Sequence, residues 1–170
     1  MTVTLSVPSV GAEPALRLRP WEMDDLPALL SAHEDPALRR WLATSLTGPA
    51  QARQWLDAQA EGWATATRFS FAVTSSDLVL GHVVVKAAAA EVGYWTAAAA
   101  RGRGVATRAL EAVSHWAFQT LELPRLGLVH AAGNHASCRV AVKCGFALHE
   151  VLPAAPPAFP SEGHRHVRSR

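Results

Sequence analysis

The sequence is poor in charge and has no long apolar run, and each shortage excludes a class of protein. Charged residues make up 18% of the 170 residues and hydrophobic residues 49%, which is too apolar for a mainly disordered chain. No run of about 18 apolar residues is present, which argues against a membrane span. Residues 1–10 lack the basic and apolar regions of a signal peptide.

Cysteine is scarce as well. Cys138 and Cys144 lie six residues apart on one predicted helix, so their thiols point to different faces and a disulfide is not expected. We interpret both as free structural thiols, which suit a reducing cytoplasm. The net charge of +2 is too small to indicate a protein that binds nucleic acid through bulk charge.

Hydrophobic periodicity and turn residues predict a mixed α/β domain. We expect residues 1–13 to be a loose leader and residues 14–170 to form one domain. Helices are expected over 21–32, 36–41, from 49 past Leu56, over 107–121 and over 136–143. Strands are expected over 16–19, 69–73, 80–86, 91–95, 126–130, 146–152 and 164–168. Two strand–helix–strand crossovers fall in the second half.

The most informative segment runs from a strand into a helix. Glu91-Val-Gly-Tyr-Trp-Thr is followed by four alanines and then by Arg101-Gly-Arg-Gly-Val-Ala-Thr-Arg. Free N–H groups at a helix start, with glycines that let a ligand approach, form an anion site. Three arginines add positive charge, so a phosphate or pyrophosphate is the natural ligand. The GxGxxG fingerprint fails at Thr107 and GxxxxGK[ST] is absent, and an ordinary glycine-containing helix start remains the alternative.

These residues resemble a known family. Arg101-Gly-Arg-Gly-Val-Ala fits the [Q/R]-x-x-G-x-[G/A] pattern of the GNAT superfamily of acyl-CoA-dependent N-acyltransferases. Leu16-Arg-Leu-Arg-Pro, Asp35-Pro36 through Leu42, and Asn134-His-Ala-Ser-Cys-Arg-Val-Ala-Val-Lys-Cys-Gly-Phe resemble its RimJ/RimL-like branch. The resemblance covers roughly residues 16–152 in order. It implies a central, mostly antiparallel sheet with a splayed parallel strand pair, flanked by helices.

The resemblance also implies a substrate and site residues. Acetyl-CoA would be the acyl donor, with its pantetheine arm between the strands 91–95 and 126–130. A backbone N–H near Tyr94 or Trp95 would stabilise the oxyanion, and Ser137 would be a candidate general acid. The cofactor-binding residues would be Tyr94, Trp95, Thr96, Arg101, Gly102, Arg103, Gly104, Val105, Ala106, Asn134 and Ser137.

The general base is less defined. An amine attacks only when neutral, and an α-amine is about a tenth neutral at pH 7 against about 0.04% for a lysine side chain. We expect Glu91, at the strand mouth, to be the first candidate base, with Tyr94 and His82 in reserve. For His82 a structural role is favoured.

Other features are interpreted as structural. His164 and His166 alternate on one strand, but no third ligand is evident, so we expect a solvated strand and no metal site. Arg139 and Lys143, one helical turn apart, could reach the 3′-phosphate of the cofactor or simply be solvated. Arg39 and Arg40 are favoured as a solvated face. Among Trp41, Trp55 and Trp63, about one is expected to touch substrate, the rest being core.

Two departures from the family affect the acceptor. The hairpin after Lys86 holds only four alanines, and the final strand could be short or contributed by a partner. The leading hypothesis is a cytoplasmic acetyl-CoA-dependent N-acetyltransferase acting on a protein or peptide α-amine, with a homodimer possible and with neither nucleic acid nor membrane as partner. The alternatives are a small-molecule amine acceptor and a non-catalytic acyl-CoA-binding module.

Overall fold

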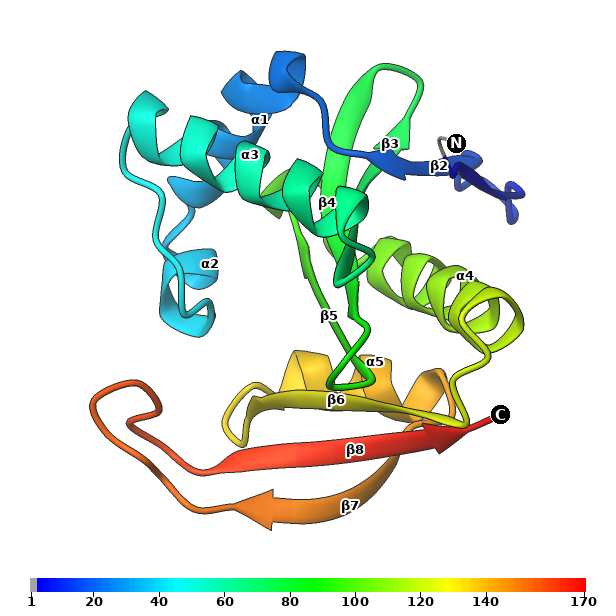
Figure 1. Cartoon of the computed structure of the whole chain (residues 1–170), viewed down its shortest axis with the longest axis vertical. Coiled ribbons are helices and arrows are strands. Elements are labelled where there is room, and N and C mark those ends of the chain that lie inside the picture. Colours follow the sequence, from blue (N-terminus) through cyan, green and yellow to red (C-terminus); the bar gives the residue numbers. More distant parts are fainter. Residues whose placement is uncertain (1–2) are drawn as a thin grey trace.

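The computed structural model describes residues 3–170, which form one eight-stranded sheet with helices packed against it (Figure 1). The strands are β1 (Leu5–Val7), β2 (Leu16–Pro20), β3 (Arg68–Ser75), β4 (Leu78–Lys86), β5 (Glu91–Thr96), β6 (Arg125–Ala131), β7 (Ala147–Leu152) and β8 (Gly163–Ser169). The helices are α1 (Leu26–His33), α2 (Pro36–Trp41), α3 (Pro49–Ala64), α4 (Val105–Thr120) and α5 (His135–Lys143), with 3-10 turns at Met23–Asp25 and Ala98–Ala100.

The order of strands in the sheet is β1-β2-β3-β4-β5-β6-β8-β7. Every neighbouring pair is antiparallel except β5 and β6, which are parallel. The parallel pairing covers only Glu91 with Gly127 and Val92 with Leu128. Beyond these residues the two strands diverge, and β6, β8 and β7 run across the direction of β5 (Figure 1). The predicted mixed sheet with a splayed parallel pair is confirmed.

Side chains on the two faces of the sheet build two apolar cores. On one face, Phe71 and Val73 join a cluster with the buried stripe of α4, in which Leu110 and Val113 are fully buried. On the other face, Ala72 belongs to a cluster formed with α1, α2 and α3. This follows from the period of two in strands and the period near 3.6 in helices.

Local signals in the sequence set the helix ends. The Asp35 carboxylate caps α2 by accepting the Ala37 N–H at 3.1 Å, and Pro36 occupies the first turn. Gly145, at φ +74°, ends α5 in the left-handed conformation that glycine adopts without strain. None of the helices in residues 3–170 is long and apolar enough to cross a membrane.

The expectation of a loose leader over residues 1–13 is wrong for the part that the structure describes; Met1 and Thr2 lie outside it. Strand β1 pairs antiparallel with β2, and Val3, Leu5 and Val7 pack against the core. Arg108 holds the following turn, because its Nη2 donates to the Pro8 and Pro14 carbonyls at 2.7 and 2.9 Å. The alternation of residues 3, 5 and 7 is a strand signal, but three residues are too few to stand out.

The sequence leaves open whether the last strand is complete, short or contributed by a partner, and the structure shows it complete. Strand β8 is seven residues long and lies between β6 and β7, pairing antiparallel with both. The chain therefore completes this end of the sheet itself. The sequence alone does not show that β8 lies between β6 and β7, because the proline-rich segment before β8 carries the chain to this inner position of the sheet.

Candidate active site

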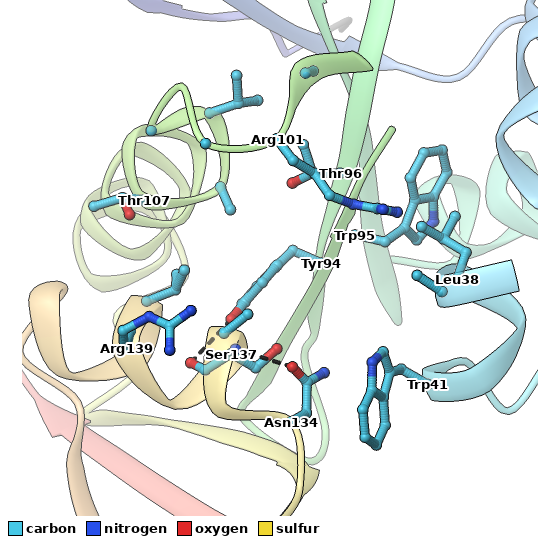
Figure 2. Close-up of a pocket in the computed structure, with 18 of the residues that line it drawn as sticks. Leu38, Trp41, Tyr94, Trp95, Thr96, Arg101, Thr107, Asn134, Ser137 and Arg139 are labelled. Carbon is cyan, nitrogen blue, oxygen red and sulfur yellow. Dashed lines mark hydrogen bonds between the residues drawn. The ribbon is translucent and has the colours of Figure 1, made fainter. Parts of the chain in front are cut away.

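A cleft of about 440 Å³ opens where β5 and β6 diverge (Figure 2). Its walls come from the end of β5, the loop into α4, the first turn of α4, the exposed face of α5 and, opposite them, α2. The lining residues are Ala37, Leu38, Trp41, Leu42, Tyr94, Trp95, Thr96, Ala100, Arg101, Gly102, Gly104, Val105, Ala106, Thr107, Asn134, Ala136, Ser137, Arg139, Val140 and Lys143.

The first turn of α4 presents an open set of backbone donors to this cleft. Gly104 is the N-cap at φ +69° and provides no side-chain cap, and no acidic residue lies in the first turn. The first N–H groups of a helix have no intrahelical acceptor, and the helix dipole adds positive potential there. A Cβ added to Gly102 or Gly104 would meet nothing within 4 Å. This geometry is what the predicted anion site requires.

The three arginines near this turn have different roles from those expected. Arg101 lines the cleft, but its guanidinium pairs with the Asp35 carboxylate at the start of α2, and this hydrogen bond holds the pKa of Asp35 below its usual value. The Arg103 side chain lies outside the cleft lining, and its Nε donates to Glu13 at 3.0 Å. Arg108 holds the N-terminal turn. Residues of the N-terminal segment thus hydrogen-bond the side chains of two of the three arginines.

Arg139 and Lys143 supply the other cations of the cleft. Both lie one helical turn apart on α5 and belong to the lining. The sequence leaves open whether they reach the cofactor or only solvent; the structure places both in the lining of the cleft.

A chain of hydrogen bonds joins β5 to the start of α5 (Figure 2). Tyr94 Oη donates to the Ser137 carbonyl at 3.3 Å, and the Asn134 side chain caps α5 by accepting the Ser137 N–H at 3.2 Å. Burial raises the pKa of Tyr94 to about 12, so its hydroxyl stays protonated. The structure therefore brings together three predicted site residues, Tyr94, Asn134 and Ser137, at the divergence of the strands.

The structure does not bring the two other candidate bases into the cleft. Glu91 lies at the closed end of the strand pair, beside Gly127, because β5 runs from the closed end towards the open one. The expectation of Glu91 at the strand mouth is wrong. His82 is only 5% exposed, and its Nδ1 accepts a hydrogen bond from Trp21 Nε1 at 3.0 Å. Desolvation lowers the pKa of His82 to about 3, which agrees with a structural role.

Helix α2 forms the wall opposite α5. Of the three tryptophans considered, Trp41 lines the cleft, and Arg40 stacks over its ring at 4.6 Å. Trp55 packs edge-on against Trp21, and Trp63 packs against phenylalanines of the core. The contribution of α2 depends on the tertiary fold, and the sequence pattern alone indicated only that one tryptophan would reach the site.

The expectation of a solvated strand around His164 and His166 is wrong. His166 is fully buried and His164 is half-buried. The reason is that β8 lies inside the sheet rather than at its edge, and α5 packs over the face that carries both rings. The same packing brings His130 of β6 and Cys138 of α5 next to them.

This chain is similar to known proteins in sequence and in structure. A Bacillus subtilis (strain 168) protein named “Putative ribosomal N-acetyltransferase YdaF” is 40% identical over 57 residues, which is 34% of this chain and 31% of that protein. The matched segment thus spans about a third of the curated relative. Among solved structures, the ribosomal L7/L12 α-N-protein acetyltransferase RimL has a TM-score of 0.84 at 17% identity, over 100% of this chain and 96% of RimL.

A second solved structure is the microcin C7 self-immunity acetyltransferase MccE in complex with acetyl-CoA and AMP. It has a TM-score of 0.77 at 16% identity, over 91% of this chain and 92% of MccE. At these identities both likenesses concern the fold alone, which is the fold that the predicted resemblance implies.

The family comparison covers most of the chain. The family described as “Acetyltransferase (GNAT) domain” matches residues 15–147, which include the whole α4 turn, the divergent strands and α5. The match confirms the predicted resemblance to the GNAT family. Together with the sheet, the cleft and the glycine-opened start of α4, it shows that the chain belongs to the GNAT acetyltransferase family.

Proposed function

We propose that the protein transfers the acetyl group of acetyl-CoA to the N-terminal α-amine of a peptide or protein. The observation that carries the proposal is the uncapped, glycine-opened N-terminus of α4, which faces a cleft between diverging strands in a GNAT domain. A pyrophosphate fits donors arranged in this way.

The donor side of the cleft has a place for each part of acetyl-CoA. The N–H groups from Arg101 to Ala106 would hold the pyrophosphate, and Arg139 and Lys143 would hold the 3′-phosphate. Strand β5 pairs with β6 only at Glu91 and Val92. Its later residues therefore offer unpaired backbone groups to the pantetheine amides, in the manner of an added strand.

The chemistry follows from these positions. The donor supplies an activated thioester, and the neutral amine displaces its thiolate directly, so that a C–N bond forms and the C–S bond breaks. The backbone N–H of Tyr94 or Trp95 would polarise the carbonyl oxygen. The Ser137 hydroxyl, with Tyr94 beside it, would give a proton to the departing sulfur. Water would take up the amine proton and return a proton to the Ser137 oxygen.

The lining of the cleft favours an α-amine. Among residues 3–170, the side chains that line it are apolar, hydroxyl, amide or cationic, without a carboxylate or an imidazole. The free energy needed to make the amine neutral at pH 7 is about 3.4 kcal/mol higher for a lysine side chain than for an α-amine. An acceptor that is already partly neutral therefore suits this site best.

The names of the relatives support a ribosomal type of acceptor. RimL is named for α-N-acetylation of ribosomal L7/L12, and YdaF carries a ribosomal N-acetyltransferase name. We propose the same acceptor class here, and with it the cytoplasm as location. Arg40 at the α2 wall would suit an acidic residue near the peptide terminus.

The test is an acceptor panel with release of CoA thiol as readout. Acetyl-CoA is incubated with a peptide that has a free α-amine and no lysine, with the same peptide α-blocked and carrying one lysine, and with a polyamine. Thiol release with the first peptide alone is the expected result, and mass spectrometry should place the acetyl group on its terminus. Turnover only with the polyamine or the lysine peptide would refute the proposed acceptor.

A further inference from the structure

Four potential metal ligands meet behind the cleft, on the buried side of α5. They are His130 of β6, Cys138 of α5, and His164 and His166 of β8, and their ligand atoms all lie within 4.8 Å of one another. In the antiparallel register His130 lies opposite His164, and His166 follows two residues later, so the three rings share one face of the sheet. Helix α5 covers that face and adds Cys138.

The hydrogen bonds of two of these rings point to a cation between them. His130 Nδ1 lies 2.8 Å from the Ala131 carbonyl, and His166 Nδ1 lies 3.1 Å from the Phe146 carbonyl. A carbonyl oxygen only accepts, so each Nδ1 carries the hydrogen. A neutral imidazole has one N–H. Both Nε2 atoms therefore present lone pairs, yet they face each other at 3.1 Å.

Two lone pairs at this distance repel unless a proton or a metal ion lies between them. His166 is fully buried, and the cluster contains no carboxylate to balance an imidazolium. A metal ion satisfies both lone pairs at once, and the Cys138 thiolate would offset part of its charge.

The other two members complete the ligand set. His164 Nδ1 is buried and has no hydrogen-bond partner among residues 3–170, and Cys138 is a free thiol. Tetrahedral zinc, with bonds of about 2.0–2.3 Å to nitrogen and sulfur, places its ligand atoms about 3.3–3.6 Å apart. The Nε2–Nε2 separation is already near this value, and modest side-chain movements would bring in the rest.

We propose that His130, Cys138, His164 and His166 form a structural zinc site. Three imidazoles and a thiolate are ligands that zinc prefers, and four protein ligands leave no open position for catalysis. The two carbonyl partners fix the ring orientations, as the outer hydrogen bonds of zinc-bound histidines do. The site ties α5 to β6 and β8, behind the face of α5 that lines the cleft, and it is independent of the acetyl acceptor.

The experiment uses the full chain without a polyhistidine tag, stripped of metal by a chelator and dialysed. Zinc is titrated in competition with a chromophoric chelator, and the bound metal is counted by mass spectrometry. Cobalt then serves as a spectroscopic probe, because a thiolate ligand gives a charge-transfer band. We expect one zinc per chain, a rise in Tm on zinc addition, and a cobalt–thiolate band with tetrahedral d–d absorption.

Matched variants separate the cluster from the rest of the chain. C138S and H164Q alter the two less buried ligands, and each should weaken zinc binding more than about 100-fold, beyond the loss caused by removing an outer hydrogen-bond partner. C144A and H149Q change a thiol and a histidine outside the cluster and should bind zinc as the parent does. The cobalt–thiolate band should persist in C144A and disappear in C138S.

Two outcomes would overturn the proposal. One is a parent protein that binds no zinc at micromolar concentrations while its thermal unfolding remains cooperative. The other is zinc binding that C138S and H164Q leave as strong as in H149Q, which would place the metal elsewhere. Melting curves of the metal-free variants show that any loss of binding occurs in folded protein.

Discussion

Helix α5 separates two polar regions that are built in opposite ways. On its cleft side, donors are left open: the N–H groups of the α4 turn have no side-chain cap, and Arg139 and Lys143 line the cleft. On its buried side, acceptor atoms converge: two Nε2 lone pairs face each other, and a histidine nitrogen and a thiol lie beside them. The first region therefore suits the reversible binding of an anion, and the second suits a permanently bound cation.

The largest expected effect concerns the open donors. Gly104→Val puts a β-branched residue at φ +69°, where it is strained, at the N-cap beside the proposed donors. Binding of acetyl-CoA, measured by calorimetry, should weaken more than about 100-fold, equal to about 2.7 kcal/mol. Zinc binding should not change.

Gly11→Val is the matched control, because Gly11 has φ +58° and lies outside the cleft lining. Backbone strain should lower the free energy of unfolding of both variants by a similar amount, about 1–3 kcal/mol. If Gly11→Val weakened acetyl-CoA binding as much as Gly104→Val, general destabilisation would explain the loss, and the anion site would be misplaced.

Neighbouring residues on α5 provide the second test of the difference between its faces. Ser137→Ala should lower kcat about 100-fold, within the range for loss of a proton donor, while the Kd of acetyl-CoA changes little. Cys138→Ser, one residue further on, should weaken zinc binding and leave the kcat of the zinc-free enzyme within about threefold of the parent's. A Ser137→Ala enzyme with full kcat would transfer the role to Tyr94, which Tyr94→Phe tests.

Buried histidines give the third contrast, because the ring of His82 packs against three tryptophans rather than against other imidazoles. Its pKa is about 3 in the folded chain against 6.5 when exposed. Below pH 6.5 the unfolded chain binds a proton that the folded chain does not, so stability falls as pH falls towards 3. At pH 5 the loss is about 2 kcal/mol.

Urea unfolding of the metal-free protein at pH 7 and pH 5 measures this loss. His82→Gln can still accept from Trp21 and does not titrate, so its stability should depend less on pH by about that amount. Equal pH dependence in parent and variant would show that other groups cause the acid sensitivity.

The contrast between the two regions also explains what the sequence could predict. The donor side is formed by consecutive residues, the strand, loop and helix start from Tyr94 to Thr107. Their geometry is therefore set by the local sequence, in which Gly102 and Gly104 are the recognisable signal. The His–Cys cluster is assembled from β6, α5 and β8, and its register becomes visible only once β8 is known to lie between β6 and β7. His164 and His166 alone gave too weak a signal.

Glu91 was misplaced for a related reason. The sequence shows that it begins a strand, but only the pairing with Gly127 shows that this start is the closed end of the divergent pair. The partners of Arg103 and Arg108 are equally invisible along the chain, because they come from the N-terminal segment some 90 residues away. Motifs therefore indicated the residues of the proposed cofactor side, while the position of Glu91, the cation partners and the α2 wall needed the tertiary structure.

The smallest effect concerns the ion pair at the cleft mouth, where Asp35 competes with a bound anion for Arg101. Asp35→Asn keeps a good N-cap for α2 and removes the competing charge. Binding of acetyl-CoA should tighten about threefold at low salt, the scale of an exposed ion pair, and this gain should shrink as salt is added. Asp57→Asn, an exposed change of the same charge on α3, should have no such effect. A weaker affinity in Asp35→Asn would mean instead that the pair holds Arg101 in the orientation that the cofactor needs.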